Sequence, residues 1–179
     1  AELAGWGKPL PAGHAHGLAL HHSFGSIVAQ VAEVSLANGQ IRVHRVVCVI
    51  DCGTVVNPAT VAQQMESSVI YGLSAALYGK IDIVGGVVQQ SNFPTYPMVS
   101  LSQSPVVETH IVPSTRHPAG VGEPAVPPLA PAVGNALFAL TGKRSAAEIG
   151  DRGRAQVLEH MIASGARLKW RSEEHTSEL

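Results

Sequence analysis

Charged residues are scarce in this sequence, and neither sign of charge dominates. Only 14% of its 179 residues are charged, and 12 Lys and Arg against 13 Asp and Glu leave a formal net charge of -1. Such a chain has no extended positive field to attract a polyanion, so we expect no nucleic-acid partner. With 45% hydrophobic residues, the composition excludes a disordered chain, and the length fits one ordinary domain.

Cysteines and long apolar runs are scarce as well. Cys48 and Cys52 are too few for a disulfide scaffold and lack the second pair of a zinc ribbon, so we interpret them as small buried residues. No apolar run approaches the roughly 18 to 20 residues of a membrane span. The sequence begins at Ala1 without an initiator Met or a signal-peptide pattern, so we expect a piece of a longer chain whose compartment is not indicated.

A Gly- and Pro-rich lead over residues 5–17 precedes two segments dense in Val, Ile and Ala. Residues 26–36 and 41–51 are typical of strands, and Asn38-Gly39 between them predicts a β-hairpin. Strict alternation puts one set of the second strand's apolar residues on one face (Ile41, Val43, Val47 and Val49) and another set on the opposite face (Val46, Cys48 and Ile50). We therefore expect its far end to be covered on both sides.

A helix is predicted from Pro58 to Tyr78, with Asn57 as its N-cap and Gly79 at its end. Gly72 inside it indicates close approach by another backbone. Apolar residues recur at every fourth position and should face the core: Val61, Met65, Val69, Leu73 and Leu77. A more polar face, which could meet a ligand, contains Gln64, Ser68 and Tyr71.

The second half is predicted to hold shorter elements. In order, these are a hairpin over residues 81–89 around Gly85-Gly86, a loop over 92–103, a strand over 106–112, a helix over 131–140 closed by Gly142, and a helix over 154–164. Residues 113–131 hold six of the 12 prolines, which excludes a regular element there. Because apolar residues stand among these prolines, we expect a stiff loop held against the protein interior.

These elements predict an α+β fold in which β-hairpins pack with helices. Residues 1–144 form the main unit, and residues 145–170 form a separate C-terminal segment that contains the last predicted helix. Residues 171–179 resemble the translation of a DNA-sequencing adapter, so we interpret them as a non-native tail and leave them out of the fold.

One carboxylate stands out in the proline-rich loop, in the run Gly120-Val-Gly-Glu-Pro124. The two glycines allow the backbone to lie close to another group, and Pro124 favours an extended conformation at Glu123. Among apolar residues and prolines this carboxylate should be poorly solvated, which would raise its pKa toward that of a general base. The alternative is an exposed loop acid.

Several motifs in order resemble the molybdopterin-binding large subunit of the xanthine dehydrogenase/aldehyde oxidase family. They are Ser23-Phe-Gly-Ser26 with the strand after it, Asp51-Cys-Gly-Thr-Val-Val-Asn-Pro58 with Gln64-Met-Glu66, and the run from Gly120 to Arg144. The motifs are similar to those of isoquinoline 1-oxidoreductase β-subunits, and the similarity spans about residues 5–144. The chain is thus similar to a C-terminal fragment of that subunit, within its second molybdopterin-binding domain.

The resemblance implies a molybdenum hydroxylase that oxidises an aldehyde or an N-heterocycle with oxygen from water. Glu123 would remove the proton from a hydroxide on molybdenum, while Gln64 and Gly122 would contact the cofactor. The implied cofactor is molybdenum-molybdopterin in its cytosine dinucleotide form. The implied partners are the remainder of the large subunit and a small subunit with [2Fe-2S] clusters, because two cysteines cannot hold a cluster. The fragment alone should be inactive.

Other signals in the sequence favour structural roles. His14, His16 and the His21-His22 pair have no cysteine or carboxylate nearby in sequence to complete a metal site, so we interpret them as structural or solvated. Asp51 is expected to bind backbone in the turn that follows it. No Gly-x-Ser-x-Gly surrounds Ser23 or Ser26, which gives hydrolase chemistry little support. The alternative to the enzyme is a non-catalytic β-rich binding or structural module of the same fold.

Overall fold

The computed structural model describes residues 1–144; the predicted helix over 154–164, the segment 145–170 and the tail 171–179 lie outside the described residues. Its main strands are β1 (His14–Ser23), β2 (Ser26–Ala37), β3 (Gln40–Asp51) and β6 (Val106–Ile111). Its helices are α1 (Pro58–Tyr78) and α2 (Leu129–Thr141). The smaller elements are η1 (Glu2–Ala4), β4 (Ile83–Val84), β5 (Val87–Val88), η2 (Phe93–Thr95) and η3 (Leu101–Gln103).

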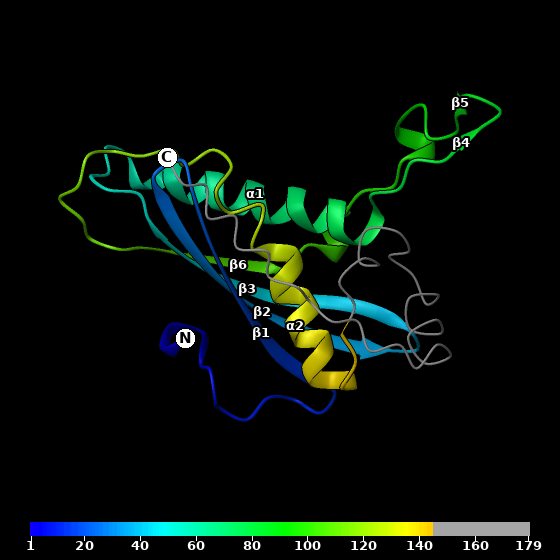
Figure 1. The fold of residues 1–179 in the computed structure, drawn as a ribbon. Coiled ribbons are helices and arrows are strands. Elements are labelled where there is room, and N and C mark those ends of the chain that lie inside the picture. Colours follow the sequence, from blue (N-terminus) through cyan, green and yellow to red (C-terminus); the bar gives the residue numbers. More distant parts are fainter. Residues whose placement is uncertain (145–179) are drawn as a thin grey trace, which may run out of the picture.

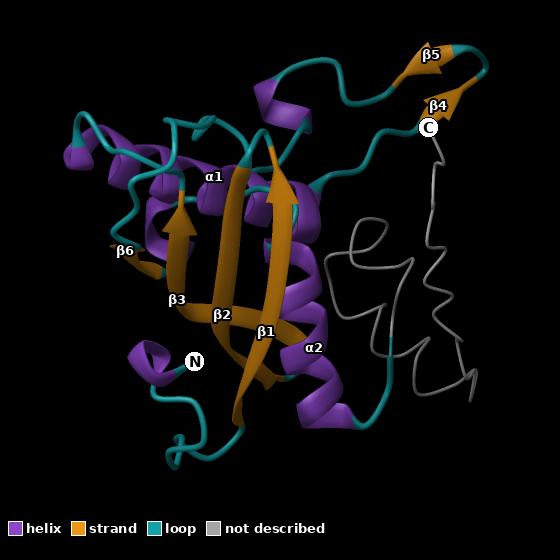
Figure 2. Cartoon of the chain, turned by 60° about the vertical axis from the view of Figure 1, so that its left-hand side comes forward, coloured by secondary structure: helices purple, strands orange, loops and turns teal. Residues whose placement is uncertain are grey.

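A four-stranded mixed sheet with two helices on one face makes up the body of the molecule (Figures 1 and 2). The strand order is β1-β2-β3-β6; β1, β2 and β3 are antiparallel neighbours, and β6 lies parallel to β3. Helix α2 packs on β1 and β2, and α1 lies against β6. The fold class predicted from the sequence, α+β with hairpins packed on helices, is confirmed.

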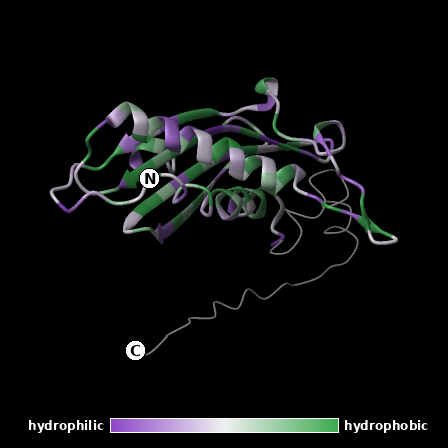
Figure 3. Ribbon diagram, turned by 90° about the horizontal axis from the view of Figure 1, so that it is seen from above, coloured by the Kyte–Doolittle hydropathy of each residue, from purple (hydrophilic) through white to green (hydrophobic). Residues whose placement is uncertain are grey.

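The predicted hairpin and first helix are both confirmed. Asn38 lies in the tight turn between β2 and β3 with φ +51°, a conformation that Asn tolerates better than most residues. Asn57 caps α1, its side-chain oxygen accepting from the backbone N–H of Ala59 at 3.0 Å and of Thr60 at 3.3 Å. All five residues of the predicted apolar stripe are buried, and Figure 3 shows hydrophobic and hydrophilic residues alternating along this helix.

Strand β1 begins at His14, inside the segment that we expected to be an irregular lead up to residue 17. Its histidines, alanines and leucines carry no strong strand signal, because β-branched residues are missing from it. The strand forms by pairing along its whole length with β2, from His14 opposite Ser35 to Ser23 opposite Ser26. Long-range pairing therefore overrides a weak local preference.

The predicted faces of β3 are wrong in one respect, because a β-bulge interrupts the alternation. The register shifts between Glu33 and Val34 of β2, so that Arg45 pairs with Glu33 while Val43 pairs with Val34. An extra residue in a strand reverses the faces beyond it. Val43 therefore packs in the same cluster as Val46 under the helices, and Val47 lies on the outer face.

Both faces of β3 are covered around Val47, as predicted. The inner face contacts the helices, and Val47, which is 2% exposed, packs on the outer face with Val31 and with Ala4 of the N-terminal turn. The two cysteines are buried and free, as expected. Burial raises the pKa of the Cys48 thiol to about 11.

The second half follows the predicted order with shifted ends. Strands β4 and β5 form the expected hairpin around Gly85-Gly86, and they lie on an arm that projects from the body (Figure 1). Helix α2 begins at Leu129 rather than at residue 131, because proline is tolerated in the first turn, where N–H groups have no helical partner. Within residues 1–144, no helix is long and apolar enough to cross a membrane.

Candidate functional site

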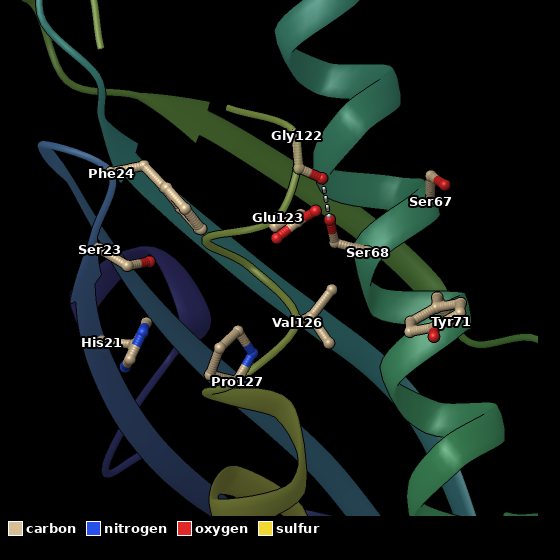
Figure 4. A pocket seen from close by; sticks show the side chains of 10 residues that line it. All are labelled: His21, Ser23, Phe24, Ser67, Ser68, Tyr71, Gly122, Glu123, Val126 and Pro127. Carbon is tan, nitrogen blue, oxygen red and sulfur yellow. Dashed lines mark hydrogen bonds between the residues drawn. The ribbon is translucent and has the colours of Figure 1, made fainter. Parts of the chain in front are cut away.

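A cavity of about 620 Å³ lies where the end of β1, the middle of α1 and the segment before α2 meet. Figure 4 shows side chains from all three regions facing it. The residues that line it are His21, Ser23, Phe24, Ser67, Ser68, Tyr71, Gly122, Glu123, Val126 and Pro127. The polar face predicted for α1 thus contributes Ser68 and Tyr71.

The proline-rich segment between β6 and α2 is tied to the body by backbone hydrogen bonds, although most of its residues before Pro124 are exposed. The N–H of Thr54 donates to Arg116 O at 2.9 Å, and the N–H of Ala119 donates to Cys52 O at 2.9 Å. Pro124 and Ala125 are buried in the core. Within residues 1–144 this segment pairs with no strand, but backbone hydrogen bonds anchor it at several points.

Gly120 brings this segment against the β1–β2 turn. Its N–H donates to Phe24 O at 3.0 Å, and a Cβ at position 120 would lie 2.8 Å from Phe24 Cβ. Phe24 itself has φ +54° and is 62% exposed. Gly120 therefore meets the sequence expectation of close backbone approach, with an aromatic side chain of the pocket wall on the other side.

Glu123 lines the cavity but is exposed in this chain. The expectation of a poorly solvated carboxylate is therefore wrong for residues 1–144 taken by themselves. The reason is geometric: Pro124 and Ala125 point into the core, and the adjacent Glu123 points away from it into the open side of the pocket. Enclosure of this carboxylate requires atoms beyond the described residues.

Gly122 also faces open space. A Cβ built on it would meet nothing within 4 Å among the described residues, so a group could lie directly beside its backbone. Its carbonyl accepts a hydrogen bond from Ser68 Oγ at 3.4 Å.

Gln64, the second predicted cofactor contact, is half-buried on α1. It lies one turn before Ser68 on the same side of the helix, but it is not among the residues that line the cavity. The structure therefore places Glu123 and Gly122 together at the cavity. Gln64 lies outside it, one turn along α1 from the cavity residue Ser68.

Six cavity residues were not predicted to belong to the site: His21, Ser23, Phe24, Ser67, Val126 and Pro127. Ser23 Oγ is buried and has no hydrogen-bond partner within residues 1–144. His21 and Ser23 come from β1, which carried little strand signal, so no periodicity could show that they face the helices, and Phe24 follows them in the β1–β2 turn. The only sequence signal was the Ser23-Phe-Gly-Ser26 match to the family.

The other predicted side chains have structural partners. Asp51 accepts from the N–H of Gly53 at 3.1 Å, as expected, and also pairs with Arg116 at 2.8 Å. Hydrogen bonding from Arg116 lowers the pKa of the Asp51 carboxyl. His14 contacts Glu33 at 2.8 Å and stacks on His44, and no metal-binding group of three His, Cys, Asp or Glu occurs among the described residues.

Comparison with known proteins identifies the family. A sequence model of the molybdopterin cofactor-binding domain matches residues 8–105, which is more than half of the chain. The chain belongs to the molybdopterin cofactor-binding domain family. This confirms the resemblance to the xanthine dehydrogenase/aldehyde oxidase family inferred from the sequence motifs.

Similar proteins of this family are oxidoreductase subunits. The chain is 36% identical over 148 residues to isoquinoline 1-oxidoreductase subunit beta of Brevundimonas diminuta, covering 80% of the chain and 19% of that protein. It is 34% identical over 151 residues to a membrane-bound aldehyde dehydrogenase (pyrroloquinoline-quinone) of Gluconacetobacter polyoxogenes, with the same two coverages of 80% and 19%. The chain therefore spans about a fifth of each relative.

The fold is also that of a solved oxidoreductase. Quinoline 2-oxidoreductase from Pseudomonas putida 86 superposes with a TM-score of 0.68 at 18% identity, covering 76% of this chain and 18% of that one. At this identity the likeness shows the fold. Together with the family match, it assigns the mixed sheet and its two helices to the molybdopterin-binding domain of molybdenum hydroxylases.

The residues at the cavity fit a molybdopterin cofactor. Such a cofactor is rich in polar atoms, so it needs hydrogen-bonding groups and room next to the backbone. Ser23 offers a buried hydroxyl without a partner in the described part of the chain, and Gly122 offers open space beside its backbone. Ser67 adds an exposed hydroxyl at the same cavity.

Proposed function

We propose that this chain is part of a molybdenum hydroxylase that oxidises an aldehyde or an N-heterocycle, with Glu123 as the base. The observation that carries the proposal is the Glu123 carboxylate directed into a cavity, beside the open backbone of Gly122, in a chain of the molybdopterin cofactor-binding domain family. The names of the relatives, isoquinoline 1-oxidoreductase and an aldehyde dehydrogenase, support these two substrate classes.

When bound, the cofactor supplies a metal that acidifies water and accepts two electrons. Glu123 would act as the base in this reaction, with its carboxylate placed to accept a proton from water during hydroxylation of the substrate. Gly122, through its open backbone, and Gln64 on α1, through its side-chain amide, would hold the cofactor. The protein thus positions the cofactor and moves the proton.

The cofactor form and the partners belong to the same proposal. The cofactor is the cytosine dinucleotide form, and electrons leave through [2Fe-2S] clusters on a small subunit, since a cluster needs four ligands and the chain has two buried cysteines. The remainder of the large subunit encloses Glu123 and covers the outer face of the sheet. Exposed apolar side chains on that face support such a contact: Leu18, Leu20 and Ile27.

Two substitutions in the complete enzyme test these roles. Glu123→Gln should leave molybdenum content nearly unchanged and lower turnover by several powers of ten, because the amide cannot accept the proton. Gln64→Ala should lower molybdenum occupancy, because it removes a contact to the cofactor. Metal analysis and turnover per bound molybdenum measure both effects. Substantial turnover in Glu123→Gln would refute the base, and full occupancy in Gln64→Ala would refute the contact.

The second candidate is a non-catalytic binding or structural module of the same fold. The exposure of Glu123 in this chain favours it, because acidic residues on surface loops are common without a catalytic role. The molybdenum and pterin content of the purified complete protein discriminates the two. A protein with neither is the module, and a protein with both is the enzyme.

A further inference from the structure

Three buried polar side chains serve the segment that carries Glu123. Within residues 1–144, the buried polar residues are Ser26 and Gln30, both 0% exposed, and Ser68, 3% exposed. Each donates a hydrogen bond to a backbone carbonyl of this one segment: Ser26 Oγ to Gly120 O at 2.6 Å, Ser68 Oγ to Gly122 O at 3.4 Å, and Gln30 Nε2 to Ala125 O at 2.7 Å. We call these three side chains the carbonyl clamp.

The clamp holds the segment on both sides of Glu123. Gly120 and Gly122 precede the carboxylate, and Ala125 follows it by two residues. The donors come from two different elements, since Ser26 and Gln30 lie on β2 and Ser68 lies on α1. The backbone around Glu123 is therefore fixed relative to the sheet and relative to the helix that forms the other wall of the cavity.

This segment needs donors from side chains. Prolines at 118, 124, 127 and 128 remove N–H groups and prevent a regular strand, so a continuous ladder of backbone hydrogen bonds cannot hold this segment. Ala125 is 0% exposed, and a buried carbonyl without a partner destabilises the fold. Gly120 and Gly122 are exposed residues, so the donors at these two carbonyls fix the position of the backbone in place of water.

Gln30 shows that the clamp is directed at the loop. Its Oε1 is buried without a hydrogen-bond partner among the described residues, while its Nε2 is shared between Ala125 O and Cys48 Sγ, the latter at 3.7 Å. A buried amide is unfavourable unless it bonds. The hydrogen bond from Gln30 Nε2 to Ala125 O offsets the cost of burying this amide, and Ala125 belongs to the segment that carries Glu123.

We propose that Ser26, Gln30 and Ser68 are positioning residues that hold the Glu123 carboxylate in the direction required for proton transfer. The inference rests on the proposed role of Glu123 as the base. Because proton transfer requires the base within hydrogen-bond reach of the proton, a shift of the loop by about 1 Å is enough to slow the reaction about a hundredfold.

The test uses the complete, cofactor-loaded enzyme with Ser26→Ala, Ser68→Ala and the near-isosteric Gln30→Met. Two matched controls remove hydroxyls from the same elements without touching the loop: Ser35→Ala on β2, where Ser35 pairs with His44, and Ser74→Ala on α1, where Ser74 accepts from the N–H of Val99. The measurements are kcat per bound molybdenum, KM, and the pH profile of kcat.

The clamp variants should lose at least about tenfold in kcat per molybdenum with KM within about twofold, and the acidic limb of the pH profile should move. The controls should retain the wild-type kcat and profile. Ser68→Thr keeps the donor and should recover most of the activity. A merely structural role would lower the amount of loaded enzyme and leave kcat per molybdenum and the pH limb unchanged.

The outcomes separate this inference from the proposed function. If Glu123→Gln abolishes turnover but the clamp variants match their controls, the clamp is refuted and the base stands. If Glu123→Gln retains turnover, the base itself is refuted. If Gln30→Met does not yield folded enzyme, Ser26→Ala and Ser68→Ala decide, because each removes one hydroxyl with little change in volume.

Discussion

Two neighbouring glycines in the Glu123 segment have opposite surroundings. A Cβ on Gly120 would lie 2.8 Å from Phe24 Cβ, whereas a Cβ on Gly122 would meet nothing within 4 Å in the described part of the chain. One glycine is required by a contact inside this fold. The other has no such contact within residues 1–144, and under the proposed function its open side is where the cofactor lies.

Substituting each glycine separates the two reasons. Gly120→Ala should lower the free energy of unfolding by about 1 to 3 kcal/mol, because the added methyl forces the turn and the segment apart. Gly122→Ala should leave the stability of this chain within about 0.5 kcal/mol of wild type, while lowering molybdenum occupancy in the complete enzyme. Urea unfolding and metal analysis measure these effects. Equal stability losses in the two variants would contradict the assignment.

Among the elements, α2 lies in contact with the backbone of β1. At Gly17 a Cβ would be 1.9 Å from Ala132 O and 2.3 Å from Ala136 N, so the helix rests directly on the strand. Asn135 adds a hydrogen bond from its side-chain amide to Leu18 O at 2.9 Å. Because Gly17 has no side chain, α2 can lie this close to the sheet. The same contact fixes the end of the loop that carries Glu123, since that loop leads into α2.

Gly17→Ala should therefore displace α2 and lower the melting temperature by several degrees, as overpacking by one methyl against backbone costs about 1 to 3 kcal/mol. Gly122→Ala adds the same methyl to open space and serves as the control. Thermal unfolding followed by circular dichroism measures the difference. A melting temperature for Gly17→Ala equal to that of the control would show that the helix does not rest on this strand as described.

At the scale of the whole molecule, pH should act on stability in two ranges. Burial lowers the pKa of His16 and, together with the charge of His14, that of His44, from the ordinary value of 6.5. Hydrogen bonds from arginines lower the pKa values of Asp51 and Glu108, through Arg116 and Arg45 respectively. All four groups bind protons more weakly in the folded chain than in the unfolded one, so acid favours unfolding.

The contribution of the two histidines to the free energy of unfolding is fully present above about pH 6.5 and is lost as the pH falls below it. The contribution of the two carboxylates is present above about pH 4 to 4.5 and is lost below that. Urea unfolding of this chain from pH 7.5 to 3 should show a decrease in both ranges. Replacing His16 and His44 by Gln should remove the upper decrease and leave the lower one. A free energy of unfolding that rises between pH 7 and 5.5 in the wild type would contradict the histidine assignment.

Local patterns identified most of the elements but not all of their neighbours. Asn57, the stripe from Val61 to Leu77 and the turn at Asn38 predicted α1 and the β2–β3 hairpin, because capping, periodicity and turn geometry act within a few residues. Strand β1 has no such pattern and forms only by pairing with β2. The cavity residues that it carries, His21 and Ser23, were therefore missed as members of the site.

By itself, the sequence determined the family, the α+β class and the identity of Glu123 as the carboxylate of interest, since these depend on motifs and on periodicities within single segments. Only the tertiary structure decided that the bulge in β3 reverses its faces, that Gln64 lies a turn away from the cavity, and that Ser26, Gln30 and Ser68 converge on the loop around Glu123. The physical reason is that these features depend on which distant segments meet. Hydrogen bonds between residues as far apart as Gln30 and Ala125 leave no periodic trace in the sequence.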